Sequence, residues 1–177
     1  MPNTAYLCLG SNIEPEDNLK AAIGMLATLT KLVAVSSVWE TKPLGLMHQP
    51  NFLNAAAIVE TDLSAAQLKR EVINRIEQSV GRVRQVDKNA PRPVDIDLML
   101  FNRQIFQLGH RHIPDPEIVE RPFVAIPLAE IAPDYQHPET GQTLSEIASN
   151  FDMKPEEMRL RQDVSQTLTQ LKIQPNL

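Results

Sequence analysis

The chain has 177 residues, of which 42% are hydrophobic and 22% charged, with 14 Pro, 6 Gly and a formal net charge of -5. A chain of this length can bury about 70% of the surface that its unfolded state exposes, so one domain needs no disulfide or metal to hold it together. The composition is that of a globular chain rather than a disordered or fibrous one. We therefore expect one domain over residues 1–150 and a C-terminal extension over 151–177 that is helical or frayed.

Charge and hydropathy argue against several classes of partner. A net negative charge disfavours nucleic acid, because affinity for phosphate backbones comes from clustered Lys and Arg. No run approaches the ~20 apolar residues of a bilayer helix, and the first residues do not form a charged and then apolar signal segment. Cys8 is the one cysteine and cannot form an internal disulfide, which fits a reducing compartment. We expect a cytoplasmic monomer with small-molecule substrates, no nucleic acid and no membrane.

The first part of the chain predicts a strand, a helix and a second strand. Apolar residues over 5–9 run into Gly10-Ser11-Asn12, which is typical of a strand that enters a turn. Pro15 suits the first turn of a helix. The apolar face of that helix repeats at i, i+3, i+4 and i+7, at Leu19, Ala22, Ile23 and Leu26. Residues 32–38 predict the second strand, which ends in a loop over 41–45.

A third strand, a second helix and a fourth strand follow. Small and apolar residues over 52–59 predict the third strand. Ser64 with Gln67 three residues later is a capping box, and an apolar helical face then continues to Gly81. Residues 94–101 predict the fourth strand. The order βαββαβ indicates an α+β fold, a ferredoxin-like sandwich with helices packed on a mainly antiparallel sheet.

The remaining chain gives weaker patterns. Residues 104–116 predict a short hairpin or extended loop, and residues 143–151 a short helix. The segment 121–133 carries Pro122, Pro127 and Pro133, which favour a packed irregular segment over a helix. The last two dozen residues are polar, with one weak helix expected and no functional motif.

Two carboxylates on the fourth strand are the strongest functional signal. Strand alternation places Asp95, Asp97, Met99 and Phe101 on one face, and Val94, Ile96, Leu98 and Leu100 on the other. The two acidic side chains then lie about 6.6 to 6.8 Å apart along the strand, where they repel each other unless a cation lies between them. Carboxylates with phosphate oxygens are the usual ligands of Mg²⁺. The alternative is a pair of solvated aspartates on an exposed face.

Basic residues gather just before this strand. They are Arg82, Arg84, Lys88 and Arg92. No glycine-rich phosphate loop occurs in the chain, so a bound nucleotide must be held by side chains and metal. Guanidinium groups beside metal-binding acids form a polyphosphate site. The alternative is that these arginines pair with the nearby acids.

Taken together, these motifs resemble the 6-hydroxymethyl-7,8-dihydropterin pyrophosphokinases of folate biosynthesis. The resemblance covers about residues 4–135 and is carried by YLCLGSN at 6–12, QPNFLN at 49–54, GRVR at 81–84, PRPVDIDLMLF at 91–101 and ERPFVAIPLAEIAP at 120–133. It implies a magnesium-dependent diphosphotransferase, which transfers the pyrophosphoryl group of ATP to the hydroxymethyl group of the pterin and releases AMP.

The resemblance also implies roles for individual residues. Asp95 and Asp97 would bind two Mg²⁺ ions, and Arg82 and Arg92 would hold the polyphosphate and stabilise its charge. The nucleotide site would include Asn74, Glu77, Arg84, Arg92 and Arg121. The pterin would stack between Phe52 and Phe123, and its polar edge would meet Asn54 and the backbone from Thr41 to Leu44.

The chain departs from the family pattern at two positions. Asn89 stands where many relatives carry an aromatic residue in the basic loop. Asp115 stands where the family often has a histidine that touches the nucleotide, and the basic residue expected slightly earlier would be His110, Arg111 or His112. The pair His110 and His112 could also bind a metal, but it lacks a third ligand in the sequence.

Three other interpretations remain open at this point. Nucleotidyl cyclase and polymerase palm domains also carry paired aspartates on a βαββαβ sheet, and they release pyrophosphate rather than AMP. An RNA-recognition domain would need exposed aromatic residues and a basic surface. A homologue without activity is the third possibility, because of Asn89 and Asp115.

Overall fold

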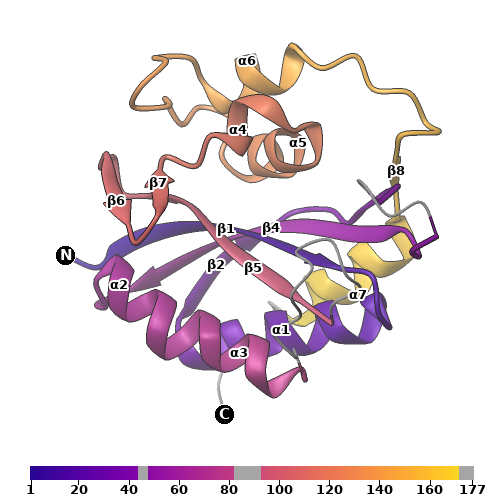
Figure 1. Cartoon of the computed structure of the whole chain (residues 1–177), viewed down its shortest axis with the longest axis horizontal. Helices are drawn as coiled ribbons and strands as arrows, with labels where there is room; N and C mark the ends of the chain where they lie inside the picture. Colours follow the sequence, from indigo (N-terminus) through magenta and orange to yellow (C-terminus); the bar gives the residue numbers. More distant parts are fainter. Residues whose placement is uncertain (44–47, 82–92, 172–177) are drawn as a thin grey trace.

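The computed structural model describes residues 1–43, 48–81 and 93–171, which build a sheet with helices on both of its faces (Figure 1). Within these residues the main sheet has six strands: β1 (Asn3–Ser11), β2 (Lys31–Val35), β3 (Trp39–Thr41), β4 (Phe52–Thr61), β5 (Asp95–Phe101) and β8 (Met158–Leu160). The strand order is β5-β1-β4-β3-β8, with β2 also paired to β4, and every pairing is antiparallel. The predicted mixture of helices and antiparallel sheet is therefore confirmed.

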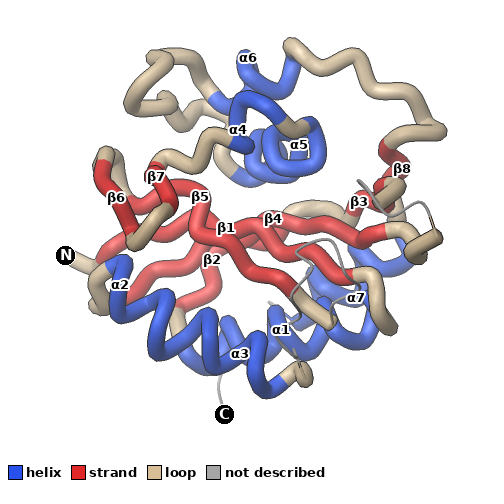
Figure 2. The backbone as a smooth tube through the Cα atoms, in the orientation of Figure 1, coloured by secondary structure: helices blue, strands red, loops and turns tan. Residues whose placement is uncertain are grey.

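Two groups of helices cover the sheet (Figure 2). One face carries α1 (Pro15–Leu29), the continuous segment α2 (Ala65–Gln67), η1 (Leu68–Ile73) and α3 (Asn74–Ser79), and α7 (Gln162–Leu171). The other face carries α4 (Glu117–Glu120), α5 (Pro122–Ile131) and α6 (Leu144–Ser149). A small hairpin of β6 (Phe106–Leu108) and β7 (Arg111–Ile113) follows β5, as the sequence predicts for residues 104–116.

Each helix group closes its own apolar cluster against the sheet. The first cluster contains the four residues predicted for the α1 face, Leu19, Ala22, Ile23 and Leu26, all with no exposed surface. The second lies under α4, α5 and α6 and includes Ala56, Met99 and Leu100. Alternation along β1 and β4 supplies both clusters, because successive strand residues point to opposite faces. The sheet is therefore buried on both faces along most of its length.

The predicted strand over 32–38 is two short strands. β2 ends at Val35 and β3 begins at Trp39, and both pair with β4. Between them the backbone N–H of Ser36 donates to Ala56 O at 2.9 Å, and Ser36 Oγ accepts from Ala56 N at 2.8 Å. The side-chain hydroxyl replaces a backbone carbonyl in the ladder, so the strand breaks without leaving a buried N–H unpaired.

A bulge in β5 corrects the predicted faces. Tyr6 pairs with Leu100 and Leu7 with Leu98, so Met99 is an extra residue in β5. As a result Leu100 joins Met99 in the second cluster, while Phe101 joins the first cluster. The prediction that Phe101 shares the face of the two aspartates was wrong. The aspartates precede the bulge and keep their predicted alternation.

The prediction of an irregular segment over 121–133 was also wrong. α5 is a regular helix over Pro122–Ile131 with Pro127 inside it. Pro122 occupies the first helical turn, where a backbone N–H has no helical partner in any case. Pro133 lies beyond the helix end, so Pro127 alone removes a helical hydrogen bond. Burial of Val124 and Leu128 against the sheet stabilises the helix despite that loss.

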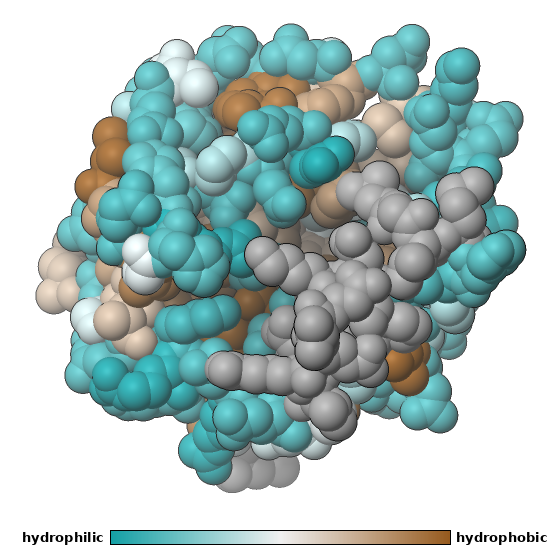
Figure 3. Space-filling model, in the orientation of Figure 1, coloured by the Kyte–Doolittle hydropathy of each residue, from teal (hydrophilic) through white to brown (hydrophobic). Residues whose placement is uncertain are grey.

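The C-terminal residues pack against the rest of the fold. β8 pairs with β3, and Arg161 N donates to Val38 O at 2.8 Å. Val164 and Leu168 of α7 are buried in the first apolar cluster. Within the described part of the chain, no helix has the length and apolar character needed to cross a bilayer. The face seen in Figure 3 is mostly hydrophilic, with small separate apolar patches.

Candidate active site

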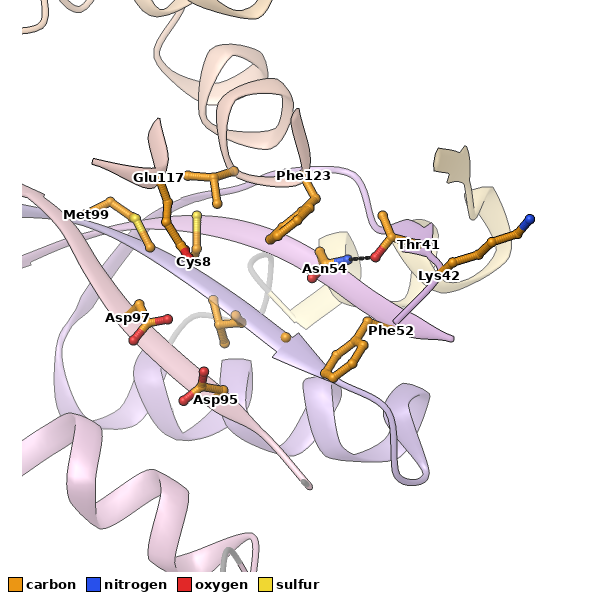
Figure 4. Close-up of a pocket in the computed structure, with 13 residues that line it drawn as sticks. Cys8, Thr41, Lys42, Phe52, Asn54, Asp95, Asp97, Met99, Glu117 and Phe123 are labelled. Atoms are coloured by element: carbon orange, nitrogen blue, oxygen red, sulfur yellow. Dashed lines mark hydrogen bonds between the residues drawn. The ribbon is translucent and has the colours of Figure 1, made fainter. Parts of the chain in front are cut away.

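A pocket opens on the sheet face that carries α4 and α5 (Figure 4). Its floor is formed by the ends of β1, β4 and β5, and its wall by α4 and α5; it encloses about 210 Å³. The lining residues are Cys8, Leu9, Gly10, Thr41, Lys42, Phe52, Asn54, Asp95, Asp97, Met99, Glu117, Phe123 and Val124. Elements far apart in sequence thus converge on one cavity, as substrate sites usually require.

The two aspartates of β5 enter the pocket side by side. Asp95 pairs with Gly10 and Asp97 with Cys8 in the antiparallel ladder, so both carboxylates project from the same face. Val94 and Ile96 alternate with them and are fully buried in the first apolar cluster. The buried alternate residues hold the strand face, and this fixes the direction of both carboxylates.

Asp97 lies in an environment that disfavours its charge. Burial is the main cause that raises its pKa from 3.8 to about 6; repulsion by Asp95 adds to the shift, and Arg111 opposes it. The pKa of Glu117 is also raised, by burial and then by Asp115. Burial raises the pKa of the Cys8 thiol well above its usual value, so Cys8 lies in the pocket as a neutral thiol. The pocket is therefore rich in acidic groups and favours a cation.

Arg111 of β7 partly neutralises this acidic group. Its guanidinium donates to Asp97 Oδ1 at 2.5 Å and to Asp115 Oδ2 at 2.6 Å. Burial alone would lower the pKa of Arg111, but the two carboxylates raise it above its usual value. Of the three basic candidates at 110–112, Arg111 is therefore the one that meets the aspartates. His112 instead contacts Glu139, at 2.6 Å.

The donor set fits a magnesium ion that is completed by a substrate. Among the described residues, no group of three or more His, Cys, Asp or Glu side chains could hold a metal. Mg²⁺ needs less from the protein, because it keeps several waters and takes further ligands from substrate phosphates. Asp95 and Asp97 supply the one or two carboxylates that such a site requires. The pair His110 and His112 gains no third ligand within the same residues.

The other end of the pocket is aromatic and neutral. Phe52 from β4 and Phe123 from α5 line it (Figure 4). Between them Asn54 is buried, and its amide donates to Thr41 Oγ1 at 2.8 Å. The amide oxygen of Asn54 lies on the side of Gly10, because a Cβ at position 10 would meet Asn54 Oδ1 at 3.3 Å. Glycine at this position keeps the pocket floor open.

The remaining predicted site residues lie in different places. Glu77 on α3 is buried and outside the pocket, and its carboxylate accepts from Ile96 N at 2.9 Å. Asn74 on the same helix is partly exposed, and Arg121 is exposed at the start of α5; neither lines the pocket. Glu77 thus holds the backbone of β5 between the two aspartates. The predicted residues Leu44, Arg82, Arg84 and Arg92 lie outside the described residues, as does Asn89.

Sequence reasoning missed several lining residues. Glu117 and Val124 reach the pocket from helices that the sequence did not predict, whereas Lys42 lies within the expected loop over 41–45. Met99 and Cys8 share the strand faces of predicted residues. Their positions on alternate residues from Asp97 and Gly10 are the signal that could have found them.

A protein-family model matches most of the chain. The family model described as 7,8-dihydro-6-hydroxymethylpterin-pyrophosphokinase (HPPK) matches residues 6–133. The chain belongs to the HPPK family. The family resemblance seen in the sequence is thus confirmed, and the chain is an ATP-dependent diphosphotransferase, since that is the reaction class of pyrophosphokinases.

Individual HPPK relatives cover most of the chain. The 2-amino-4-hydroxy-6-hydroxymethyldihydropteridine pyrophosphokinase of Haemophilus influenzae is 40% identical over 151 residues, which is 84% of this chain and 92% of that protein. The Bacillus subtilis enzyme of the same name is 42% identical over 137 residues, 74% of this chain and 79% of that protein.

A solved structure shows the same fold at low identity. The wild-type HPPK-DHPS of Plasmodium falciparum with pteroate matches with a TM-score of 0.68 and 14% identity. The match covers 88% of this chain but only 47% of the Plasmodium chain, so this chain spans less than half of that protein. The fold described above is therefore that of an HPPK domain.

Proposed function

We propose that the chain transfers the pyrophosphoryl group of ATP to the hydroxymethyl group of 6-hydroxymethyl-7,8-dihydropterin and releases AMP, in a magnesium-dependent step of folate synthesis. One observation carries the proposal: a single pocket joins a pair of carboxylates, Asp95 and Asp97, to an aromatic cavity with a buried amide, Asn54. The first end suits a metal-bound polyphosphate, and the second suits a flat heterocycle with hydrogen-bonding edges.

The pterin would occupy the aromatic end. Phe52 from the floor and Phe123 from the wall offer aromatic rings to the same end of the pocket, and stacking of a flat bicycle on such rings is favourable. Asn54 is held by Thr41, so its amide oxygen is oriented before the substrate arrives. A polar edge that binds in a buried site must find matched partners, and this fixed amide supplies one. Leu44 would add backbone contacts to the same edge.

The nucleotide would occupy the acidic end. Asp95 and Asp97 would bind two Mg²⁺ ions, and the bound metal would neutralise phosphate charge and activate the attacking and leaving oxygens. Arg82 and Arg92 would hold the polyphosphate, with Arg84, Arg121, Asn74 and Glu77 near the nucleotide. With both substrates in place, the pterin oxygen attacks the β-phosphorus in line, so that catalysis is mostly positioning and charge stabilisation.

We also propose a fold type, a cellular location and an oligomeric state for the chain. The strand order β5-β1-β4 followed by β2 and β3, with the helices α1 and α2–α3 on one face, supports a ferredoxin-like core. Cys8, a free thiol with no second cysteine in the chain to pair with, supports a reducing, cytoplasmic location. We propose that the enzyme acts as a monomer.

The test is the product of the reaction. The protein is incubated with ATP, Mg²⁺ and the pterin alcohol, and AMP and pyrophosphate are quantified separately. AMP release that depends on the pterin supports the proposal, whereas pyrophosphate release would indicate a cyclase or polymerase reaction. Asp95→Ala should abolish AMP release with an unchanged circular dichroism spectrum. Asp163→Ala, far from the pocket on α7, is the matched control and should retain full activity.

A further inference from the structure

Arg111 bridges two carboxylates of different exposure at the acidic end of the pocket. One guanidinium nitrogen lies 2.5 Å from Asp97 Oδ1 and another lies 2.6 Å from Asp115 Oδ2. The exposed fractions of the side chains are 35% for Arg111, 20% for Asp97 and 4% for Asp115. The guanidinium therefore bridges a buried carboxylate, that of Asp115, and a carboxylate that faces the pocket, that of Asp97. We call Asp115 the anchor of Arg111.

The anchor itself is fixed on several sides. Asp115 N donates to Met99 O at 2.9 Å, which ties it to β5 beside Asp97. Its Oδ1 accepts from Glu117 N at 3.0 Å, so one carboxylate oxygen serves the start of α4 and the other serves Arg111. A buried carboxylate with both oxygens occupied holds its cation in one geometry. Arg111 is thus a positioned charge rather than a mobile surface side chain.

This positioned charge occupies one of the two carboxylate oxygens that Asp97 could offer to a metal. An ion that binds Asp97 must displace the guanidinium from Oδ1 or approach beside a fixed positive charge, and both cost free energy. Among the described basic residues, Arg111 is the one that forms an ion pair with Asp97.

We propose that Arg111, held by Asp115, is a built-in counter-ion for Asp97 that competes with divalent cations. The nucleotide-free protein then binds the metal weakly, and the metal loads together with the polyphosphate, whose negative charge offsets the nearby guanidinium. Arg111 acts here through Asp97 and is a positioning residue. The inference rests on the proposed function in one respect, since it takes Asp97 as a metal ligand.

The test is binding of Mn²⁺ alone, measured by electron paramagnetic resonance in the absence of nucleotide and pterin. The variant is Arg111→Met with Asp115→Asn, which removes Arg111 together with the buried carboxylate that holds it, frees Asp97 of its counter-ion and keeps the net charge of the protein. We expect its affinity for Mn²⁺ to rise about tenfold, the change that corresponds to loss of one charge-assisted contact. A purely structural role for the pair would lower the affinity or leave it unchanged, and either result overturns the inference.

Two further variants make the result specific. Arg103→Met removes a cation that stacks on Tyr135 away from Asp97, and its Mn²⁺ affinity should match that of the wild type. An equal rise in Arg103→Met would show a general charge effect and would also overturn the inference. Arg111→Lys keeps the charge but cannot bridge two carboxylates in a fork, so a smaller rise is expected. If the double variant does not fold, Arg111→Lys decides, because an unchanged affinity there refutes the competition.

The outcome is separate from that of the proposed function. AMP release by the wild type tests the function, and Mn²⁺ binding without substrates tests the counter-ion. A wild type that releases AMP, together with a double variant of unchanged affinity, would leave the function in place and remove only the role of Arg111.

Discussion

Replacement of Asp97 by Asn should stabilise the metal-free protein. The pKa of Asp97 is raised from 3.8 to about 6, chiefly by burial and then by Asp95, so ionisation of this group opposes folding. A shift of about two pKa units corresponds to about 3 kcal/mol at pH 8, which a neutral amide of the same shape would recover. For a chain of this size that gain raises Tm by roughly 6 to 12 °C.

The gain should depend on pH with a defined sign. Because the folded pKa lies above the unfolded one, the folded state retains the proton longer, and stability is lost as pH rises from about 4 to about 6. The difference between Asp97→Asn and the wild type should therefore be largest at pH 8. It should fall to about half by pH 5 and be mostly gone near pH 4, where the folded state is protonated and the unfolded state is close to its own pKa.

Urea denaturation in the presence of EDTA at pH 8, 5 and 4 measures this difference. Asp163→Asn is a control of opposite sign, since a side-chain hydrogen bond from Arg161 lowers the pKa of Asp163 to about 2 and its ionised form favours folding. A variant Asp97→Asn that is less stable than the wild type at pH 8, or whose advantage does not change with pH, would refute the reasoning. The same variant should lose AMP release.

Three other predictions address the pocket floor, the C-terminal helix and the tyrosines. Gly10→Ala places a methyl group 3.3 Å from Asn54 Oδ1 and 3.9 Å from Phe52. In steady-state kinetics we expect KM for the pterin to rise about fivefold or more, with little change in KM for ATP. An unchanged KM for the pterin would contradict this prediction. Leu168→Ala leaves a cavity at a fully buried position of α7 and should lower the free energy of unfolding by about 2 to 5 kcal/mol in urea titrations. A loss under about 1 kcal/mol would mean that α7 contributes little to the core. Burial raises the pKa of Tyr6 and raises that of Tyr135 to about 12, so absorbance at 295 nm should show no half-ionisation of the tyrosines near pH 10 in the folded protein. The free energy of unfolding should fall between about pH 10 and 12. Tyrosinate formation near pH 10 with an intact far-ultraviolet spectrum would be inconsistent with this.

Local patterns predicted the helices and strands whose signals lie within one element. The four apolar positions of α1 are all buried, and the capping box of Ser64 and Gln67 is formed with both of its hydrogen bonds. These features depend on spacing of three or four residues and on side chains that bond to their own backbone. Such signals survive in the fold because tertiary packing reinforces them.

Features that depend on a partner strand were not predictable in the same way. The bulge at Met99 arises from the register between β5 and β1, and nothing in the β5 sequence marks it. The irregular segment expected over 121–133 is a helix because Val124 and Leu128 are buried against a sheet that the local sequence does not contain. The number of prolines predicted an irregular segment, but Pro122 and Pro133 lie at or beyond the helix ends and do not interrupt the helix.

The candidate site likewise combines features that the local sequence predicts with features that only the fold produces. Asp95 and Asp97 share a face because strands alternate, and this could be read from two positions of the sequence. The pairing of Phe52 with Phe123 across the pocket, by contrast, joins β4 to α5 over a long separation. The motifs indicated both residues through family resemblance, and only the fold brings them to one cavity.

Which of the basic residues at 110–112 faces Asp97 depends on the register of the β6–β7 hairpin. The sequence of these three residues does not specify that register. In the β6–β7 hairpin Phe106 pairs with Ile113, and Ile113 is buried in the first apolar cluster. Arg111 and Ile113 are two positions apart and share one side of the strand, whereas His112 points to the other side. The burial of Ile113 therefore directs Arg111 to Asp97 and His112 to Glu139. A shift of one residue would exchange the two side chains and place an imidazole beside Asp97. The charge that opposes Asp97 is therefore decided by the burial of a side chain two positions away, and not by the basic residues themselves.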